Sequence, residues 1–297
     1  MTDARKELRS LKTIRTFMKV GACSETLINC LNRAFGEPMA PEEHASMPLA
    51  GGIMRQGYQC GMLWGASLAA GAEAHRQFGP GPKAEAMSIL ASQRLVERFS
   101  RRTKTINCLE ITDTDWNNSW ETTKYMLRGG PVYCFRMAAR YAREAHEEIT
   151  ACFADPAAEI PVAPVSCTSL FVRKMGLSER HATMTSGFAG GIGLCGGACG
   201  ALGAAVWLLA MVFLKDDPQA NMWKSKEFQA KLDALIETYL KSSDFEFECE
   251  KVVGRKFDGV EDHARHTCEG GCATILEALA AYLKANGYPV EMDEAKA

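Results

Sequence analysis

FAGGIGLCGGACGALGAAVWLLAMVFL, residues 188–214, decides how this chain is organised, because a weaker copy of it lies near the N-terminus. The copy is AGGIMRQGYQCGMLWGA, residues 50–66. In both segments Ala-Gly-Gly-Ile is followed at the same spacing by Cys-Gly, so that Cys60 and Cys199 occupy the same place in the two copies. A phrase repeated in this way indicates an internal duplication, which determines the fold more than any single element does.

Further cysteines recur at almost the offset that separates Cys60 from Cys199. Cys108 recurs as Cys249, and Cys134 recurs as Cys272. Upstream, a cysteine-bearing run precedes each Gly-Gly segment, with Cys23 in the first copy and Cys167 in the second. We therefore predict a tandem duplication of a module of about 140 residues, with modules at 1–152 and 165–297 and the proline-containing segment 155–164 as the linker.

The composition is that of an ordinary globular protein, with 47% hydrophobic and 24% charged residues among 297. A net charge of -2 leaves no basic footprint, so nucleic acid is not an expected partner. The N-terminal segment lacks the apolar core of a signal peptide, and we expect a cytoplasmic protein. Thiols stay reduced in that compartment, which favours metal binding or redox work over structural disulfides.

The segment 187–214 has no charged residue and is long enough to cross a bilayer. Its counterpart in the first copy contains Arg55 and continues into Glu73. Two copies of one fold should not place one helix in lipid and its equivalent in water. We therefore expect no membrane span, and predict that this segment is the buried central helix of its module.

Apolar residues recur at helical spacing along most of the chain, beginning with Leu8, Leu11, Ile14 and Phe17. The helices expected in the first module are 1–36, a small-residue helix that Cys60 opens and Gly79 closes, 84–99 and 132–151, with an extended connector at 105–111 and a loop or short helix at 41–48 and at 117–124. Those expected in the second are 166–175, 178–185, 201–213, 225–241 and 274–286. No segment shows sustained β alternation, so the predicted fold class is all-α.

The glycines before each Cys-Gly lack the preceding strand and the acidic partner of a nucleotide-binding loop. Glycine there is better explained by close approach of the backbone to something bulky or by tight helix packing. A cysteine at the point where a loop enters a helix also lies near the positive end of the helix dipole, which stabilises a thiolate.

The residues Cys60-Gly61-Met62-Leu63-Trp64-Gly65 resemble the central signature of the redox-active proteins named for a C_GCAxxG_C_C pattern. Cys199-Gly200-Ala201 matches it in the second copy, with Ala204 where the motif has its last glycine. The resemblance covers almost the whole chain twice. It implies a small redox module that holds an iron–sulfur cluster, and the absence of Cys-x-x-Cys-His means that covalent haem is not implied.

Carried over residue by residue, the resemblance implies four metal-ligating cysteines in each module. These are Cys23, Cys60, Cys108 and Cys134 in the first and Cys167, Cys199, Cys249 and Cys272 in the second. Cys30, Cys195 and Cys268 share a helix face with three of these and are rivals for their places. Cys152 matches nothing and is expected to be an inert buried thiol. Gly61 and Gly200, directly after the central cysteines, are expected to lie against the cluster and point a backbone N–H at its sulfur.

Three other interpretations stay open. Cysteine packs well in cores, so the chain could be a helical interaction scaffold with ordinary buried thiols. Four thiolates also suit zinc, although zinc sites favour Cys-x-x-Cys knuckles, which are missing. A thiol–disulfide oxidoreductase or redox sensor without metal could use Cys195 with Cys199 or Cys268 with Cys272.

The remaining chemistry is sparse. His263 and His266 flank Cys268 and could be metal ligands or proton carriers. The chain offers no Ser-His-Asp order and no His-Glu-x-x-His motif, so a hydrolytic activity is not predicted. The favoured function is electron transfer with a redox partner protein, with a homo-oligomer as a further possibility.

Overall fold

The computed structural model describes residues 4–155 and 166–287, and over these residues it is helical, with two isolated β-bridges and no strand. The all-α prediction is confirmed. The first module contains α1 (Ala4–Glu7), α2 (Ser10–Val20), α3 (Cys23–Phe35), α4 (Ala40–Ala45), the 3₁₀ turn η1 (Met47–Leu49), α5 (Ala50–Ile53), α6 (Gly61–Phe78), α7 (Pro82–Thr103), α8 (Cys108–Thr112), α9 (Ser119–Leu127) and α10 (Gly130–Phe153). The second contains α11 (Cys167–Lys174), α12 (Glu179–Ser186), α13 (Gly200–Asp216), α14 (Lys226–Ser242), α15 (Cys249–Val253), α16 (Val260–Cys268) and α17 (Ala273–Ala285).

The long helices match their predictions, whereas the short ones that carry cysteines differ. The single helix expected over 1–36 is three helices, and α2 ends where Gly21 takes a left-handed conformation with φ of 77°. The connector expected over 105–111 is extended only around Asn107, after which α8 begins. Helices α15 and α16 were not predicted. Most of the predicted linker, 156–164, lies outside the described residues.

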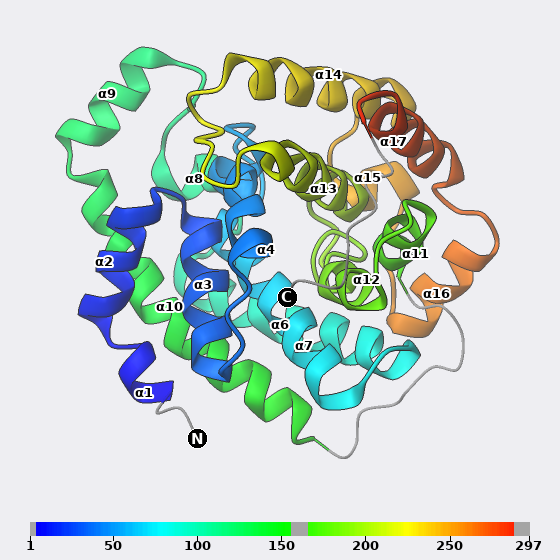
Figure 1. Ribbon diagram of the computed structural model, residues 1–297, viewed down its shortest axis with the longest axis horizontal. Helices are drawn as coiled ribbons and strands as arrows, with labels where there is room; N and C mark the ends of the chain where they lie inside the picture. The colour runs from blue at the N-terminus through cyan, green and yellow to red at the C-terminus, as the bar shows by residue number, and fades with distance from the viewer. Residues whose placement is uncertain (1–3, 156–165, 288–297) are drawn as a thin grey trace.

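Helices α6 and α13 form the centre of the molecule (Figure 1). Every residue of α6 from Gly61 to Ala74 is buried, and so is every residue of α13 from Gly200 to Met211. Helix α6 packs against α3, α7 and α12, and α13 packs against α4, α11, α14 and α17. Burial in a protein core therefore accounts for the uncharged segment of the second module. Along the described chain no helix combines the length and apolarity that crossing a membrane requires.

Two contacts join residues that occupy the same place in the two modules. A Cβ at Gly203 would lie 2.4 Å from the Trp64 ring, and the repeat aligns these two positions. The repeat also aligns Glu42 with His181, whose buried side chains lie 3.2 Å from each other. A residue that meets its own counterpart lies on a twofold axis. The modules thus pack as homologous dimers do, and their apolar residues form one continuous core.

The same unusual turn precedes the central helix of each module. Residues 51–55 all have positive φ, between 45° and 73°, and residues 190–194 repeat this between 57° and 81°. Glycine is required within it, since a Cβ at Gly52 would lie 2.3 Å from the Tyr58 backbone nitrogen. Ile53 and Ile192 also take this conformation, which is a strained one for a β-branched residue. Strain repeated at equivalent places indicates a functional constraint on the turn.

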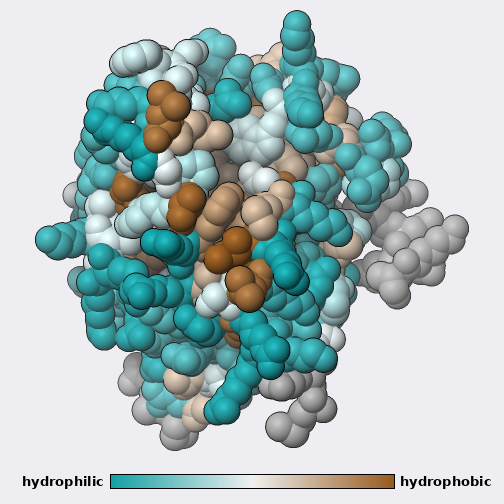
Figure 2. Space-filling model, turned by 90° about the vertical axis from the view of Figure 1, so that its left-hand side faces the viewer, coloured by the Kyte–Doolittle hydropathy of each residue, from teal (hydrophilic) through white to brown (hydrophobic). Residues whose placement is uncertain are grey.

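Figure 2 shows the face of the molecule that carries α2 and α9, where apolar side chains gather near the middle. Helices α2, α9 and α10 carry exposed large hydrophobic residues. They are Leu11, Met18, Trp120, Met126, Leu127, Val132 and Tyr133.

Candidate functional site

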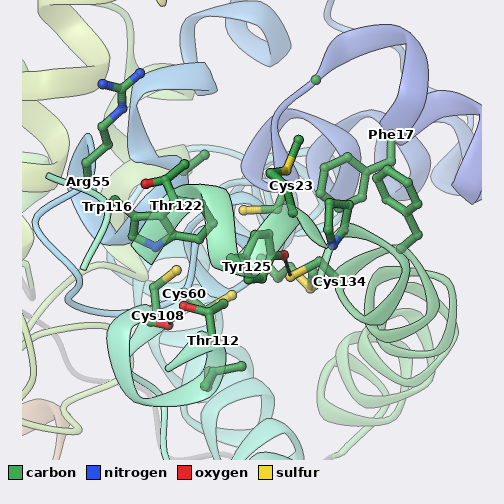
Figure 3. A pocket seen from close by; sticks show the side chains of 18 of the residues that line it. Phe17, Cys23, Arg55, Cys60, Cys108, Thr112, Trp116, Thr122, Tyr125 and Cys134 are labelled. Carbon is green, nitrogen blue, oxygen red and sulfur yellow. Dashed lines mark hydrogen bonds between the residues drawn. The ribbon is translucent and has the colours of Figure 1, made fainter. Parts of the chain in front are cut away.

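The four predicted cysteines of the first module line one cavity of about 790 Å³ (Figure 3). They come from four different helices. Cys23 is the first residue of α3, Cys60 is the N-cap of α6, Cys108 is the first residue of α8, and Cys134 lies near the start of α10.

The second module places its cysteines in the same way. Cys167 is the first residue of α11, Cys199 the N-cap of α13, Cys249 the first residue of α15, and Cys272 the N-cap of α17. Seven of these eight cysteines therefore lie at the N-cap or first residue of a helix, where the free N–H groups and the helix dipole favour negative charge, and Cys134 lies one turn into α10. Thiolates, and a negatively charged cluster bound to them, are stabilised at such positions.

An isolated antiparallel bridge holds two of the cysteines together in the first module. It pairs Gln59 with Asn107, so that the Cys60 N–H donates to the Ile106 carbonyl at 2.8 Å and the Cys108 N–H donates to the Tyr58 carbonyl at 2.7 Å. The starts of α6 and α8 are fixed side by side as a result.

The second module repeats this bridge between Ala198 and Glu248. Here the Cys199 N–H donates to the Phe247 carbonyl at 2.9 Å, and the Cys249 N–H donates to the Gly197 carbonyl at 2.6 Å. Recurrence of the bridge at the same register shows that the central cysteine and the third one are equivalent pairs. The rings of Tyr58 and Phe247 stack at 4.1 Å, which places the two bridges against each other.

The thiols of the first module act on one another. A hydrogen bond from Cys60 lowers the pKa of Cys23, and the same contact raises the pKa of Cys60 well above its usual value. Burial raises the pKa of Cys108 to about 12, and nearby Cys23 adds to that effect. Burial likewise raises the pKa of Cys134 to about 11. The left-handed turn also helps to lower the pKa of Cys23, because the Gly51 N–H faces the Cys23 sulfur.

In the second set the pKa of every one of the four thiols is raised. Burial is the main cause that raises the pKa of Cys167, Cys199 and Cys249, and it raises the pKa of Cys272 to about 12. Charge on Cys272 and Cys199 contributes to the shift of Cys167, so these thiols lie near one another. The Gly190 N–H faces the Cys167 sulfur, as its counterpart does in the first module.

A side chain that sequence reasoning missed contacts the fourth cysteine of the first set. The Tyr125 hydroxyl donates to the Cys134 sulfur at 3.0 Å. His266, at the corresponding place in the second module, has its Nε2 3.7 Å from the Cys272 sulfur. Gly130 leaves room for the ring in the first module, as Gly271 does in the second, because a Cβ would come within 2.2 Å of it. The repeat itself was the signal, since it brings Tyr125 into line with a histidine already noted.

The other cysteines lie apart from these sets. Cys30 is buried in α3, and Cys152 is buried in α10. The Cys195 sulfur donates to the Gly191 carbonyl at 2.6 Å, and Cys268 is exposed. All twelve cysteines are free thiols, so neither disulfide pair considered from the sequence is formed. The two thiols that shift each other's pKa most are instead Cys23 and Cys60.

The glycines after the central cysteines have little room for a side chain. A Cβ at Gly61 would lie 2.6 Å from the Cys23 sulfur, and one at Gly200 would lie 2.1 Å from the Phe188 carbonyl oxygen. The N–H groups that face the central sulfurs are those of Met62 in the first module and of Ala201 and Leu202 in the second. They come one or two positions later than predicted.

The donor set was compared with what a metal centre needs. Among the described residues no three His, Cys, Asp or Glu side chains converge closely enough to hold a single ion. The first four thiols instead line the wall of a shared cavity. Cysteine thiolates hold [2Fe–2S] and [4Fe–4S] clusters at several corners of a larger body, and this spread donor set suits such a cluster.

Comparison with known families gives one result. A family model described as "Putative redox-active protein (C_GCAxxG_C_C)" matches the chain at residues 22–148 and again at 165–285. The two matches confirm the tandem duplication. Searches of curated proteins and of solved structures returned no match.

Proposed function

Because this chain belongs to the C_GCAxxG_C_C family of redox-active proteins and carries its module twice, we propose that each module holds one iron–sulfur cluster. The ligands would be Cys23, Cys60, Cys108 and Cys134 in the first module and Cys167, Cys199, Cys249 and Cys272 in the second. The protein would then transfer electrons.

One observation carries the proposal above the others. The four recurrent cysteines of the first module open onto one cavity, whereas Cys152, which does not recur, is buried elsewhere in α10. If the thiols only filled the core, there would be no reason for the four recurrent ones to share a wall. A duplicated bridge that fixes Cys60 beside Cys108 adds to this.

A bound iron–sulfur cluster would supply a one-electron couple at each site. The chain's own residues would set the conditions for it. The helix N-termini favour negative charge on sulfur. The Gly51 N–H does the same for Cys23, and the Gly190 N–H does so for Cys167 in the second module. Hydrogen bonds to the sulfurs, such as that from Tyr125, tune the potential. Gly61 would keep the Cys23 sulfur free of contact with a side chain.

The expected partner is another redox protein, or a second copy of this chain, in a reducing compartment such as the cytoplasm. The first cavity reaches the surface at α2 and α9, the helices on the face shown in Figure 2, since Met18 of α2 and Met126 of α9 line the cavity and are exposed. An electron donor or acceptor that docks on this face would come close to the first centre.

A metal-free dithiol is the second candidate, and one contact favours it. Cys23 receives a hydrogen bond from Cys60, which lowers its pKa, and a thiolate next to a second thiol is the arrangement of a redox dithiol. Formation of their disulfide would release two electrons and two protons to an oxidant. Zinc would be a third way to use the same thiolates.

Anaerobic purification followed by absorption and electron paramagnetic resonance spectroscopy distinguishes these candidates. We expect a brown protein whose broad visible absorption bleaches on reduction and whose reduced form gives a resonance signal. Cys60→Ser should remove part of this signal, and Cys152→Ser should leave it unchanged. A colourless protein in which air links Cys23 to Cys60 would support the dithiol instead.

A further inference from the structure

The cavity of the first module is larger than a cluster requires. Its volume of about 790 Å³ is within the range of about 300–1,000 Å³ that small-molecule sites occupy. A cluster that is bonded to the four cysteines would fill only the space between their sulfurs. Figure 3 shows Arg55, Trp116 and Thr122 together at one end and Cys134 with Phe17 at the other. Trp223, from the second module, completes the lining.

The end away from Cys134 carries buried polar atoms without partners. Among the described residues, neither the Thr122 hydroxyl nor the Trp223 indole nitrogen has a hydrogen bond. The Trp116 indole N–H faces the Cys108 sulfur and lowers the pKa of that thiol, yet it makes no hydrogen bond of normal geometry. Burying such a group without a hydrogen bond destabilises the protein. An indole N–H can only donate, so a molecule that satisfied these groups would have to present acceptors.

The charge of the lining points the same way. Arg55 is the one charged side chain among the described residues that line the cavity, and no carboxylate lines it. Its guanidinium lies 5.2 Å from the centre of the Trp223 ring. The Asn117 side-chain amide donates to the Arg55 carbonyl at 3.3 Å and so fixes the Arg55 backbone. A guanidinium beside an indole ring suits a planar molecule that ends in a carboxylate.

The second module lacks the arginine that lines the first-module cavity. The repeat aligns Arg55 with Leu194, which is buried in an apolar cluster with Ile89 and Phe257. Both residues have positive φ, 73° for Arg55 and 60° for Leu194, so leucine is accommodated in the same turn. The two modules therefore differ in the part of the site that would recognise a ligand.

We propose that the first-module cavity binds a small planar organic carboxylate beside the thiol centre, with Arg55 and the Trp223 indole N–H on its oxygens. The carboxylate proposal depends on the proposed function in one respect only: a cluster would occupy the space between the four thiols.

Isothermal titration calorimetry with benzoate tests this on the full-length protein, prepared both without and with iron. Benzoate should bind saturably to the iron-free protein, and uncharged benzyl alcohol should not. Arg55→Leu, which introduces the residue of the second module, should weaken binding by roughly tenfold or more, since charge-assisted hydrogen bonds are the strong ones. Trp223→Phe keeps the ring, removes the N–H, and should weaken binding several-fold. Arg101→Leu, at an exposed position outside the cavity, is the control and should bind as the wild type does.

Three results would overturn the proposal. These are no saturable binding of benzoate, equal binding to the Arg55→Leu protein, and displacement of benzoate by inorganic phosphate at equal concentration. The last would mean that any anion suffices. The titration also uses iron-free protein, so it tests the carboxylate site separately from the cluster. If the chain binds benzoate but never takes up iron, the cluster proposal is rejected and the carboxylate proposal stands.

Discussion

Gly61→Ala tests whether the glycine next to the central cysteine is required by the site. The added Cβ would lie 2.6 Å from the Cys23 sulfur and 2.8 Å from the Ala50 Cα, well inside the optimum separation of about 3.5–4.0 Å for carbon contacts. Overpacking of this kind costs about 1–3 kcal/mol, while alanine returns about 1 kcal/mol of helix propensity. The expected balance is a loss of up to about 2 kcal/mol, which lowers Tm by up to about 8 °C in a chain of this size.

Differential scanning fluorimetry and iron analysis on the same samples measure both consequences. Gly259→Ala is the matched control, because a Cβ there meets nothing within 4 Å and its φ of 177° is open to any residue. We expect that variant to differ by less than about 1 kcal/mol, the scale of an N-cap effect. If Gly61→Ala raised Tm and left the iron content intact, the glycine would be incidental, and the argument that Cys23 belongs to a crowded centre would fail.

Three further outcomes follow from particular side chains. Tyr125→Phe should lower the reduction potential of the first centre only, because it removes a hydrogen bond to the Cys134 sulfur. A changed potential at the second centre, where His266 faces Cys272, would contradict this reasoning. Cys268, the one exposed cysteine, should react first with a thiol reagent in the native protein, and Cys268→Ser should abolish that fast phase. Burial opposes the charge on Glu42, but the hydrogen bond from His181 and nearby positive charge lower the pKa of Glu42 below its ordinary 4.5. The charged carboxylate therefore stabilises the fold above pH 4.5, and this stabilisation is lost as the pH falls below that value. Glu42→Gln should therefore flatten the acid side of the stability curve, and an unchanged acid side in chemical denaturation would refute this.

The duplication made much of the fold predictable from the sequence. The shared spacing from Ala-Gly-Gly-Ile to Cys60 and to Cys199 aligned the modules, and helical periodicity placed α6, α7 and α13. The first three cysteines of each module fall at equivalent helix starts, as a repeat requires.

The left-handed turns could not be predicted. Local propensity opposes positive φ at residues such as Ile53 and Ile192, and these conformations exist only because the surrounding packing imposes them. Helix α16 is too short and too polar to give a clear apolar period. The contact of Tyr125 with Cys134 was also hidden, because it depends on how the start of α10 packs against α9.

The central claim is that two equivalent modules each hold one cluster on four cysteines, and the content of iron and acid-labile sulfide per chain tests it most directly. The measurement compares anaerobically reconstituted wild type with Cys60→Ser, Cys199→Ser and the double variant. We predict that each single variant loses about half of both elements, that the double variant loses nearly all, and that Cys152→Ser loses none. Wild-type protein without stoichiometric sulfide, or a double variant that keeps its iron, would contradict the account.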